Sequence, residues 1–359
     1  MNSATESLPT LQHVLDTLVE QGAVTAGTVP AIEEKLRQSS APIPSEPWFV
    51  KLLMGAGAWV AALFFVLCLG IAGLIQENAA GLFVWAVVFL VAAVSLRTWS
   101  NRLFTVQLAL ALSVAGHGFA LASAVSSAES GSGDTALLLM AVTSVALSIG
   151  LYPIYRDTLH RFLSCLLAAG CIVLWIANKN MWPALYFLLL FQVAAIAFVF
   201  VKRPDLRFLR PLGFAMTIAM TASMFLALLP EEEFTVVWWP VRALLAGCLI
   251  WLYQWIVGGW NGMRNEPMMI AVAATLALAS FTTPGILAAL AIMILGYARW
   301  ESELTAIGLA FFPMFIGVFY FEWQTSLLTK SWILAGSGSV LLVARYYLSC
   351  RAWAGKEER

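Results

Sequence analysis

Long apolar runs separated by short polar segments dominate the chain from about residue 52 onward. The runs are roughly 15–24 residues long, close to the length with which an α-helix crosses a bilayer. We place twelve spans, near residues 52–75, 80–96, 103–125, 135–153, 160–177, 183–201, 209–229, 236–258, 267–281, 284–298, 303–320 and 326–348. The pattern therefore predicts an all-α fold, a polytopic transmembrane helical bundle of about 12 spans.

The segment before the first run has a different pattern. Apolar residues there repeat with helical spacing at Leu11, Val14, Leu15 and Leu18, and the stretch "SSAPIPSEP" follows as a linker. We expect residues 1–50 to form a cytoplasmic N-terminal helical pair with its linker. Residues 51–350 would then be the transmembrane helical domain, and residues 351–359 a cytoplasmic tail.

Composition agrees with a membrane protein and narrows the chemistry. The chain is 61% hydrophobic and 11% charged, whereas soluble domains are about half apolar and a quarter charged. Its formal net charge is zero, which gives no electrostatic case for nucleic acid. The five cysteines include no CxxC pair. We expect the lipid bilayer as the surroundings, with no cofactor, no metal and no nucleic acid.

Positive charge predicts the orientation. With twelve spans, one side of the membrane holds every lysine and arginine except Lys179, Arg242 and Lys330. Because positive residues are retained on the cytoplasmic side, both termini should be cytoplasmic.

The ninth and tenth spans are short. About fifteen helical residues cover only about 23 Å of a roughly 30 Å hydrocarbon core. Reading 267–298 as one broken span would reverse the sidedness of everything after it, so the charge pattern favours two spans that meet at Pro284 and Gly285. Such a pair is either a peripheral hairpin or a transporter-like binding element.

Acidic residues are absent from the middle of every predicted span. Proton pumps and many cation transporters use carboxylates there, so these mechanisms are disfavoured. Intramembrane aspartyl proteases need aspartates within the membrane, and zinc metalloproteases of this kind need an HExxH motif. The sequence has neither, so both classes are disfavoured. No nucleophile–base set is visible either, and we expect no enzymatic activity.

His117 is the titratable residue nearest the middle of a span, with Gly116 and Gly118 beside it. A functional role competes with a structural one, in which a neutral imidazole bonds to a neighbouring helix. The remaining histidines, His13 and His160, are expected in or near the cytoplasm. A histidine metal site is therefore not expected.

Two cations lie near the outer ends of spans. Arg242, one or two turns into its span, would snorkel to the surface or bind an anion. Lys330, about one turn into the last span, would be neutralised by Glu322. Ser337 and Ser339 follow it, and they form either a helix-packing seam or part of a polar vestibule.

Three stretches carry a resemblance to a known family: "LVEQGAVT", "PWFVKLLMGAGAWVAALFF" and "SLLTKSWILAGSGSVLLVARYYL". The chain resembles an uncharacterised family of bacterial polytopic inner-membrane proteins, a domain of unknown function, in which Lys330 and Ser331 match a Lys-Ser pair. Family members are often encoded beside a membrane protein with a GDYXXLXY motif. The resemblance implies a bacterial inner-membrane location and a second membrane protein as partner.

These observations favour a non-enzymatic subunit or scaffold of a membrane complex. The alternative is a transporter or channel for a small solute, based on the span count, the short 267–298 pair, His117 and the polar stretch after Lys330. An enzyme acting on lipid is the third possibility.

Overall fold

The computed structural model describes residues 17, 19–21, 25–30, 47–75, 78–128, 133–226, 239–322, 328 and 331–332. Within them lie eleven α-helices: α3 (Trp48–Ile71), α4 (Ala79–Trp99), α5 (Leu103–Ser126), α6 (Gly133–Ile154), α7 (Thr158–Asn178), α8 (Trp182–Ala197), α9 (Arg210–Leu226), α10 (Trp239–Ile256), α11 (Glu266–Phe281), α12 (Pro284–Arg299) and α13 (Ser302–Glu322). Four short 3-10 or π turns are also described: η1 (Ala26–Thr28) before α3, and η2 (Phe198–Lys202), η3 (Arg207–Leu209) and η4 (Gly262–Arg264) between helices.

These helices coincide with the first eleven predicted spans, and the all-α prediction is confirmed. Seven of the helical segments, from α3 to α9, are long and apolar enough to cross a membrane, which indicates a membrane protein. The predicted span 326–348 and most of the N-terminal helical pair lie outside the described residues.

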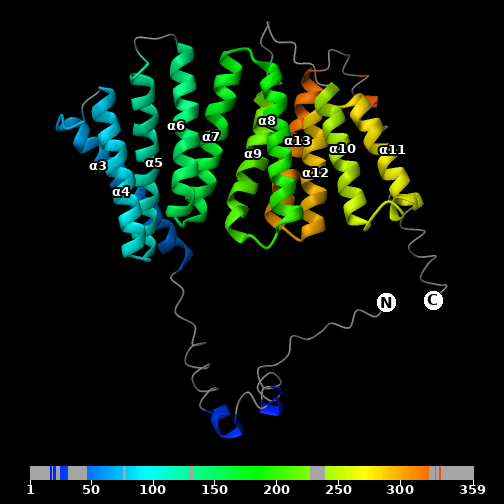
Figure 1. The fold of residues 1–359 in the computed structure, drawn as a ribbon, viewed down its shortest axis with the longest axis horizontal. Helices are drawn as coiled ribbons and strands as arrows, with labels where there is room; N and C mark the ends of the chain where they lie inside the picture. The colour runs from blue at the N-terminus through cyan, green and yellow to red at the C-terminus, as the bar shows by residue number, and fades with distance from the viewer. Residues whose placement is uncertain are drawn as a thin grey trace.

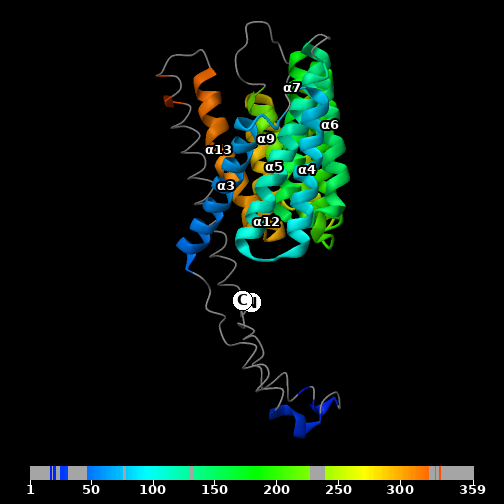
Figure 2. The same cartoon turned by 90° about the vertical axis from the view of Figure 1, so that its left-hand side faces the viewer.

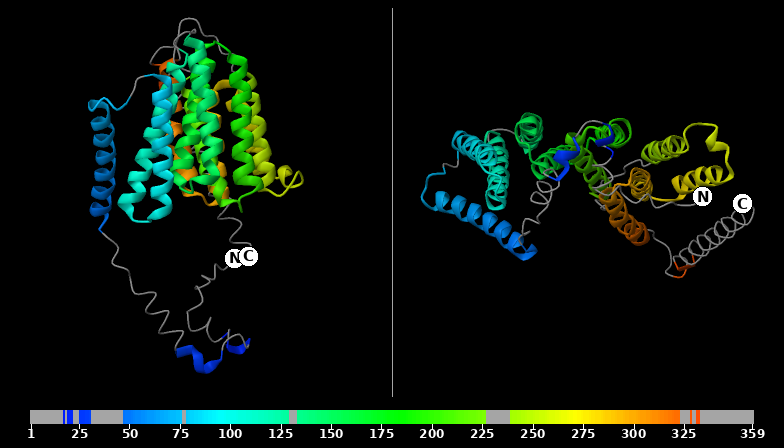
Figure 3. Two further views of the ribbon diagram at one scale, coloured as in Figure 1. Left: turned by 60° about the vertical axis from the view of Figure 1, so that its left-hand side comes forward. Right: turned by 90° about the horizontal axis from the view of Figure 1, so that it is seen from below.

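Neighbouring helices run side by side and alternate in direction (Figure 1). Seen from below, they form a curved layer with α3 at one end and α10 and α11 at the other (Figure 3). The view turned by 90° places α3 and α13 on the same face of the molecule (Figure 2).

The interior is divided between two apolar clusters. The smaller one joins α3, α4 and α5 around Phe89, with Tyr155 at its edge. The larger one draws on α7 to α13 and includes Leu189, Leu249 and Leu287. Between the clusters, α6 packs against both α5 and α7. A site that joins α5 to α7 therefore lies where the two halves of the domain meet.

The short 267–298 region forms two helices, as predicted. Thr282 and Thr283 are both extended between them, and Pro284 begins α12 at a position where its missing N–H is not needed. The pair is not a peripheral hairpin, however. Nine residues of α12 are buried, and α12 packs against α10 and α13 more than against α11. The two helices are similarly apolar, so their sequences do not show that α12 is far more buried than α11. Only tertiary packing decides this difference in burial.

Charged residues lie at the helix ends throughout the described part of the chain. Ion pairs join Arg97 to Asp157 and Arg210 to Glu301 at one end of the bundle. Lys179 pairs with Asp134 at the other end. The expectation that acids avoid the middle of the spans holds for the described carboxylates.

Candidate functional site

The candidate site begins with His117, which lies in α5 with only 4% of its surface exposed. Its Nδ1 is 2.9 Å from the carbonyl oxygen of Ser113, one turn earlier. Since a carbonyl oxygen only accepts, this contact assigns the proton to Nδ1 and leaves Nε2 as an acceptor. The bond lies within α5, so it is not the interhelical bond of the structural interpretation.

Gly116 explains how α5 comes close to its neighbour. A Cβ at this position would stand 2.8 Å from Cγ of Leu90 and 3.2 Å from the carbonyl oxygen of Ala86, both in α4. The missing side chain lets the two helices touch. Gly118, by contrast, has open space around it. Of the two glycines beside His117, one therefore serves close helix packing.

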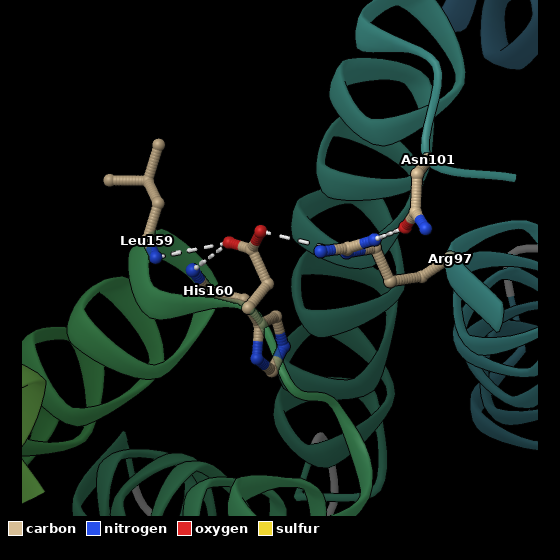
Figure 4. A network of polar contacts seen from close by, with 5 residues as sticks. Arg97, Asn101, Leu159 and His160 are labelled. Atoms are coloured by element: carbon tan, nitrogen blue, oxygen red, sulfur yellow. Dashed lines mark hydrogen bonds and ion pairs between the residues drawn. The ribbon is translucent and has the colours of Figure 1, made fainter. Parts of the chain in front are cut away.

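The second residue is His160, in the first turn of α7 and 2% exposed. Asp157 caps this helix, because its Oδ1 accepts from the backbone N–H groups of Leu159 and His160, each at 3.0 Å. Its Oδ2 lies 3.8 Å from Nε of Arg97, and Arg97 donates to Asn101 at 2.8 Å (Figure 4). The cap and the ion pair set the position of the His160 ring relative to α4.

The structure brings three rings from separate segments together. The ring centroids of His117 and His160 are 5.4 Å apart, and those of His160 and Tyr155 are 4.3 Å apart. The sequence predicted that His160 lies in or near the cytoplasm, and it did not predict this contact with His117. Its place at a helix start is as the sequence suggests, but α7 packs so that the ring is buried beside His117.

Several polar atoms of this cluster have no hydrogen-bond partner among the described residues. They are His117 Nε2, both ring nitrogens of His160, the Tyr155 hydroxyl and Ser113 Oγ. Buried polar groups in proteins are nearly always bonded, and each one left alone costs about 1–3 kcal/mol. Such a concentration of unsatisfied atoms therefore points to water or a polar ligand at this place.

Space for such a ligand exists on one side of the rings. A cavity of about 300 Å³ lies between α3, α5 and α7, and its lining includes Trp59, Ser113, His117, His160 and Ser164. This volume exceeds what one water molecule needs. The unbonded atoms of Ser113 and of both histidines belong to residues that line it.

A second cavity lies on the other side of the rings, near the Arg97 end of the bundle. It measures about 420 Å³, and Arg97, Tyr155 and Arg156 contribute to its wall. Burial, with the Asp157 carboxylate nearby, raises the pKa of the Tyr155 phenol, so this group stays neutral at ordinary pH. Tyr155, which lines this basic cavity, thus contacts His160, which lines the inner cavity.

Of the other predicted residues, Arg242 lies among the described residues and is not part of this cluster. Arg242 lies one turn into α10, as predicted, with its Nε buried and unbonded among the described residues. Lys330, Ser337 and Ser339 lie outside the described part. Glu322 ends α13, but its side chain also lies outside the described part.

Sequence reasoning missed His160 and Tyr155. The signal available was the helix start "RDTLHRF", in which Asp157 is a favourable N-cap and His160 falls in the first turn. That signal locates His160 along the chain. It carries no information on which helix faces α7.

The family described as "Domain of unknown function (DUF4401)" matches residues 47–350 of the chain. The matched region contains every helix from α3 to α13 and both cavities of the candidate site. No curated protein and no solved structure matches the chain.

Proposed function

The chain belongs to the DUF4401 family, and we propose that it is a multi-pass protein of a bacterial inner membrane that passes a small polar solute through the His117–His160 cavity. In this proposal the domain has twelve spans and both termini are cytoplasmic, as positive charge predicts. The protein binds and releases its solute without a catalysed reaction.

One observation carries this proposal: Ser113, His117 and His160, whose side chains carry buried, unbonded hydrogen-bonding atoms, line a cavity within the helical domain. Polar residues inside a membrane protein are expensive and tend to mark solute pathways. The neighbouring cavity at Arg97 and Arg156 lies on the predicted cytoplasmic side. It would serve as the vestibule on that side.

The lining also suggests the class of solute. The residues around the inner cavity include histidine and serine but no lysine, arginine, aspartate or glutamate. Imidazole and hydroxyl groups offer both donors and acceptors without a fixed charge. We therefore propose a small uncharged solute that carries hydroxyl or amide groups.

A flux measurement tests the proposal. The full chain in proteoliposomes should speed osmotic re-swelling when urea or glycerol is the probe solute. His117→Ala and His160→Ala should each lower this flux about tenfold, because each removes a hydrogen bond along the path. His13→Ala is the matched control, since the sequence places His13 in the N-terminal segment outside the membrane, and its flux should equal that of the wild type.

Two outcomes would contradict passage through this cavity. One is wild-type protein that moves neither probe faster than empty vesicles do. The other is flux that both alanine variants retain in full while they remain folded, as judged by an unchanged thermal unfolding temperature.

A second candidate function, that of a non-enzymatic subunit or scaffold of a membrane complex, is supported by α3. Only 11% of its apolar window is buried within the chain, the smallest share among the seven candidate spans. It packs mainly against α5 and shares one face of the molecule with α13 (Figure 2). In this proposal, a second membrane protein encoded nearby covers that face.

Purification in mild detergent from native membranes tests the second candidate. A membrane partner should accompany the chain at stoichiometric yield and be lost from the double variant Leu53→Trp, Val60→Trp, which changes the exposed face of α3. Leu190→Trp, on the exposed face of α8, is the control and should keep the partner. A solitary chain from gently solubilised membranes would oppose the subunit function.

A further inference from the structure

A large apolar cavity forms a groove along α7. It measures about 560 Å³, within the range of ligand pockets, and is formed by α6, α7, α8 and the start of α9. Its lining is almost entirely apolar, with Ile149, Ala168, Leu188, Phe191 and Leu212 among the contributors. Among the described residues, it shares no lining residue with the His117–His160 cavity, so the two cavities are separate.

The groove is open sideways between α6 and α8. Ile149 and Phe191 on its rim are 71% and 61% exposed. Along α6 its lining extends from Val145 to Pro153, a rise of about 12 Å. An apolar chain in the surrounding bilayer can therefore reach the groove without crossing a polar region.

Polar and basic groups gather at one end of the groove. The hydroxyl of Tyr152 donates to the carbonyl oxygen of Phe208 at 2.7 Å and so ties the end of α6 to η3. Arg161 donates from Nε to the carbonyl oxygen of Tyr152 at 2.8 Å, and its guanidinium lies 5.0 Å from the Tyr152 ring centroid. A cation is thus fixed at the mouth by a hydrogen bond and by the face of an aromatic ring.

The charge at the mouth is positive. Arg207 directly precedes the groove residues Phe208 and Leu209. Among the described residues, neither Arg161 nor Arg207 has an ion-pair partner, because the nearby acids Asp157 and Glu301 pair with Arg97 and Arg210. Of the other described acids at this end, Asp205 lies exposed in the loop before Arg207, and Glu266 and Glu303 lie in the first turns of α11 and α13.

We propose that this groove binds one acyl chain of an anionic phospholipid, whose phosphate lies at Arg161 and Arg207. Basic pockets between membrane helices on the cytoplasmic side are recognised sites for anionic headgroups. The guanidinium of an arginine can bind phosphate through two parallel hydrogen bonds. The apolar groove accounts for the chain, and the basic mouth accounts for the preference for a negative headgroup.

Native mass spectrometry of the full chain tests this site, with dioleoyl phosphatidylglycerol and dioleoyl phosphatidylethanolamine supplied in equal amounts. Wild-type protein should retain phosphatidylglycerol in preference. Arg207→Ala should lower its occupancy about fivefold, since each basic group near a headgroup contributes on this scale. Arg161→Lys keeps the charge and should retain more of the lipid than Arg161→Ala does.

Filling the groove gives an independent test. Ala168→Phe should displace the lipid whatever its headgroup, because Ala168 lines the groove and is buried. Leu174→Phe, on the exposed face of the same helix, and Arg102→Ala, an exposed cation at the same end of the bundle, are matched controls that should bind as the wild type does. Equal retention of the two lipids by the wild type, or full occupancy in Ala168→Phe, would overturn the proposal.

Discussion

Gly296→Ala is expected to destabilise the protein by roughly 2–3 kcal/mol, although it adds a single methyl group. A Cβ at Gly296 would lie 2.5 Å from the backbone nitrogen of Thr305 and 3.0 Å from its Cα. These atoms belong to the backbone of α13 and cannot move aside as the end of a flexible side chain can. The substitution must therefore push α12 and α13 apart.

Gly308 makes the same contact from the opposite side. A Cβ there would stand 2.8 Å from the backbone nitrogen of Met293 and 2.9 Å from the carbonyl oxygen of Ala289. The two glycines thus allow α12 and α13 to approach backbone to backbone, the arrangement that small residues permit in membrane helices. Gly308→Ala should lower stability by a similar amount.

Gly317→Ala supplies the matched control on α13, since a Cβ there meets nothing within 4 Å. Alanine favours helix more than glycine does, so this variant should unfold at or slightly above the wild-type temperature. The measurement is thermal unfolding of the purified full chain in one detergent. Equal unfolding temperatures for Gly296→Ala and Gly317→Ala would show that α12 and α13 do not pack this closely.

His160→Leu should stabilise the protein by about 1–3 kcal/mol while it lowers solute flux about tenfold, as His160→Ala does. Both ring nitrogens of His160 are buried without a partner among the described residues, so an apolar side chain of similar size removes an unsatisfied pair of polar atoms. The same change removes hydrogen-bonding groups from the wall of the inner cavity. Stability and function are therefore expected to change in opposite directions.

Thermal unfolding and probe flux on the same preparation measure both effects. His160→Gln is the control: it keeps a donor and an acceptor in the site and should bring no gain in stability. A fall in unfolding temperature for His160→Leu, with flux unchanged, would instead assign the imidazole a structural role. That result would contradict the proposal that the solute passes through this cavity.

Local pattern accounts for what the sequence predicted well. Apolar runs of bilayer length cannot leave backbone groups unbonded in lipid, so they form helices wherever they occur. For this reason the positions of α3 to α13 follow from composition and run length. Pro284 correctly predicted a boundary between two helices, since α12 begins there. The N-cap formed by Asp157 explains where α7 begins.

Run length and hydropathy do not determine which helix faces which, because lipid is as apolar as the helix surfaces and gives no hydrophobic drive for one pairing over another. Close contacts such as Gly116 with α4 and Gly296 with α13 decide it. This is why α12 proved central when a peripheral hairpin was an open alternative, and why His160 proved to lie against His117. By itself, the sequence determined a helical membrane protein and several polar residues of interest, of which His117 in α5 lies nearest the middle of a span. Only the packing of α5, α6 and α7 made that residue part of a cluster with a cavity.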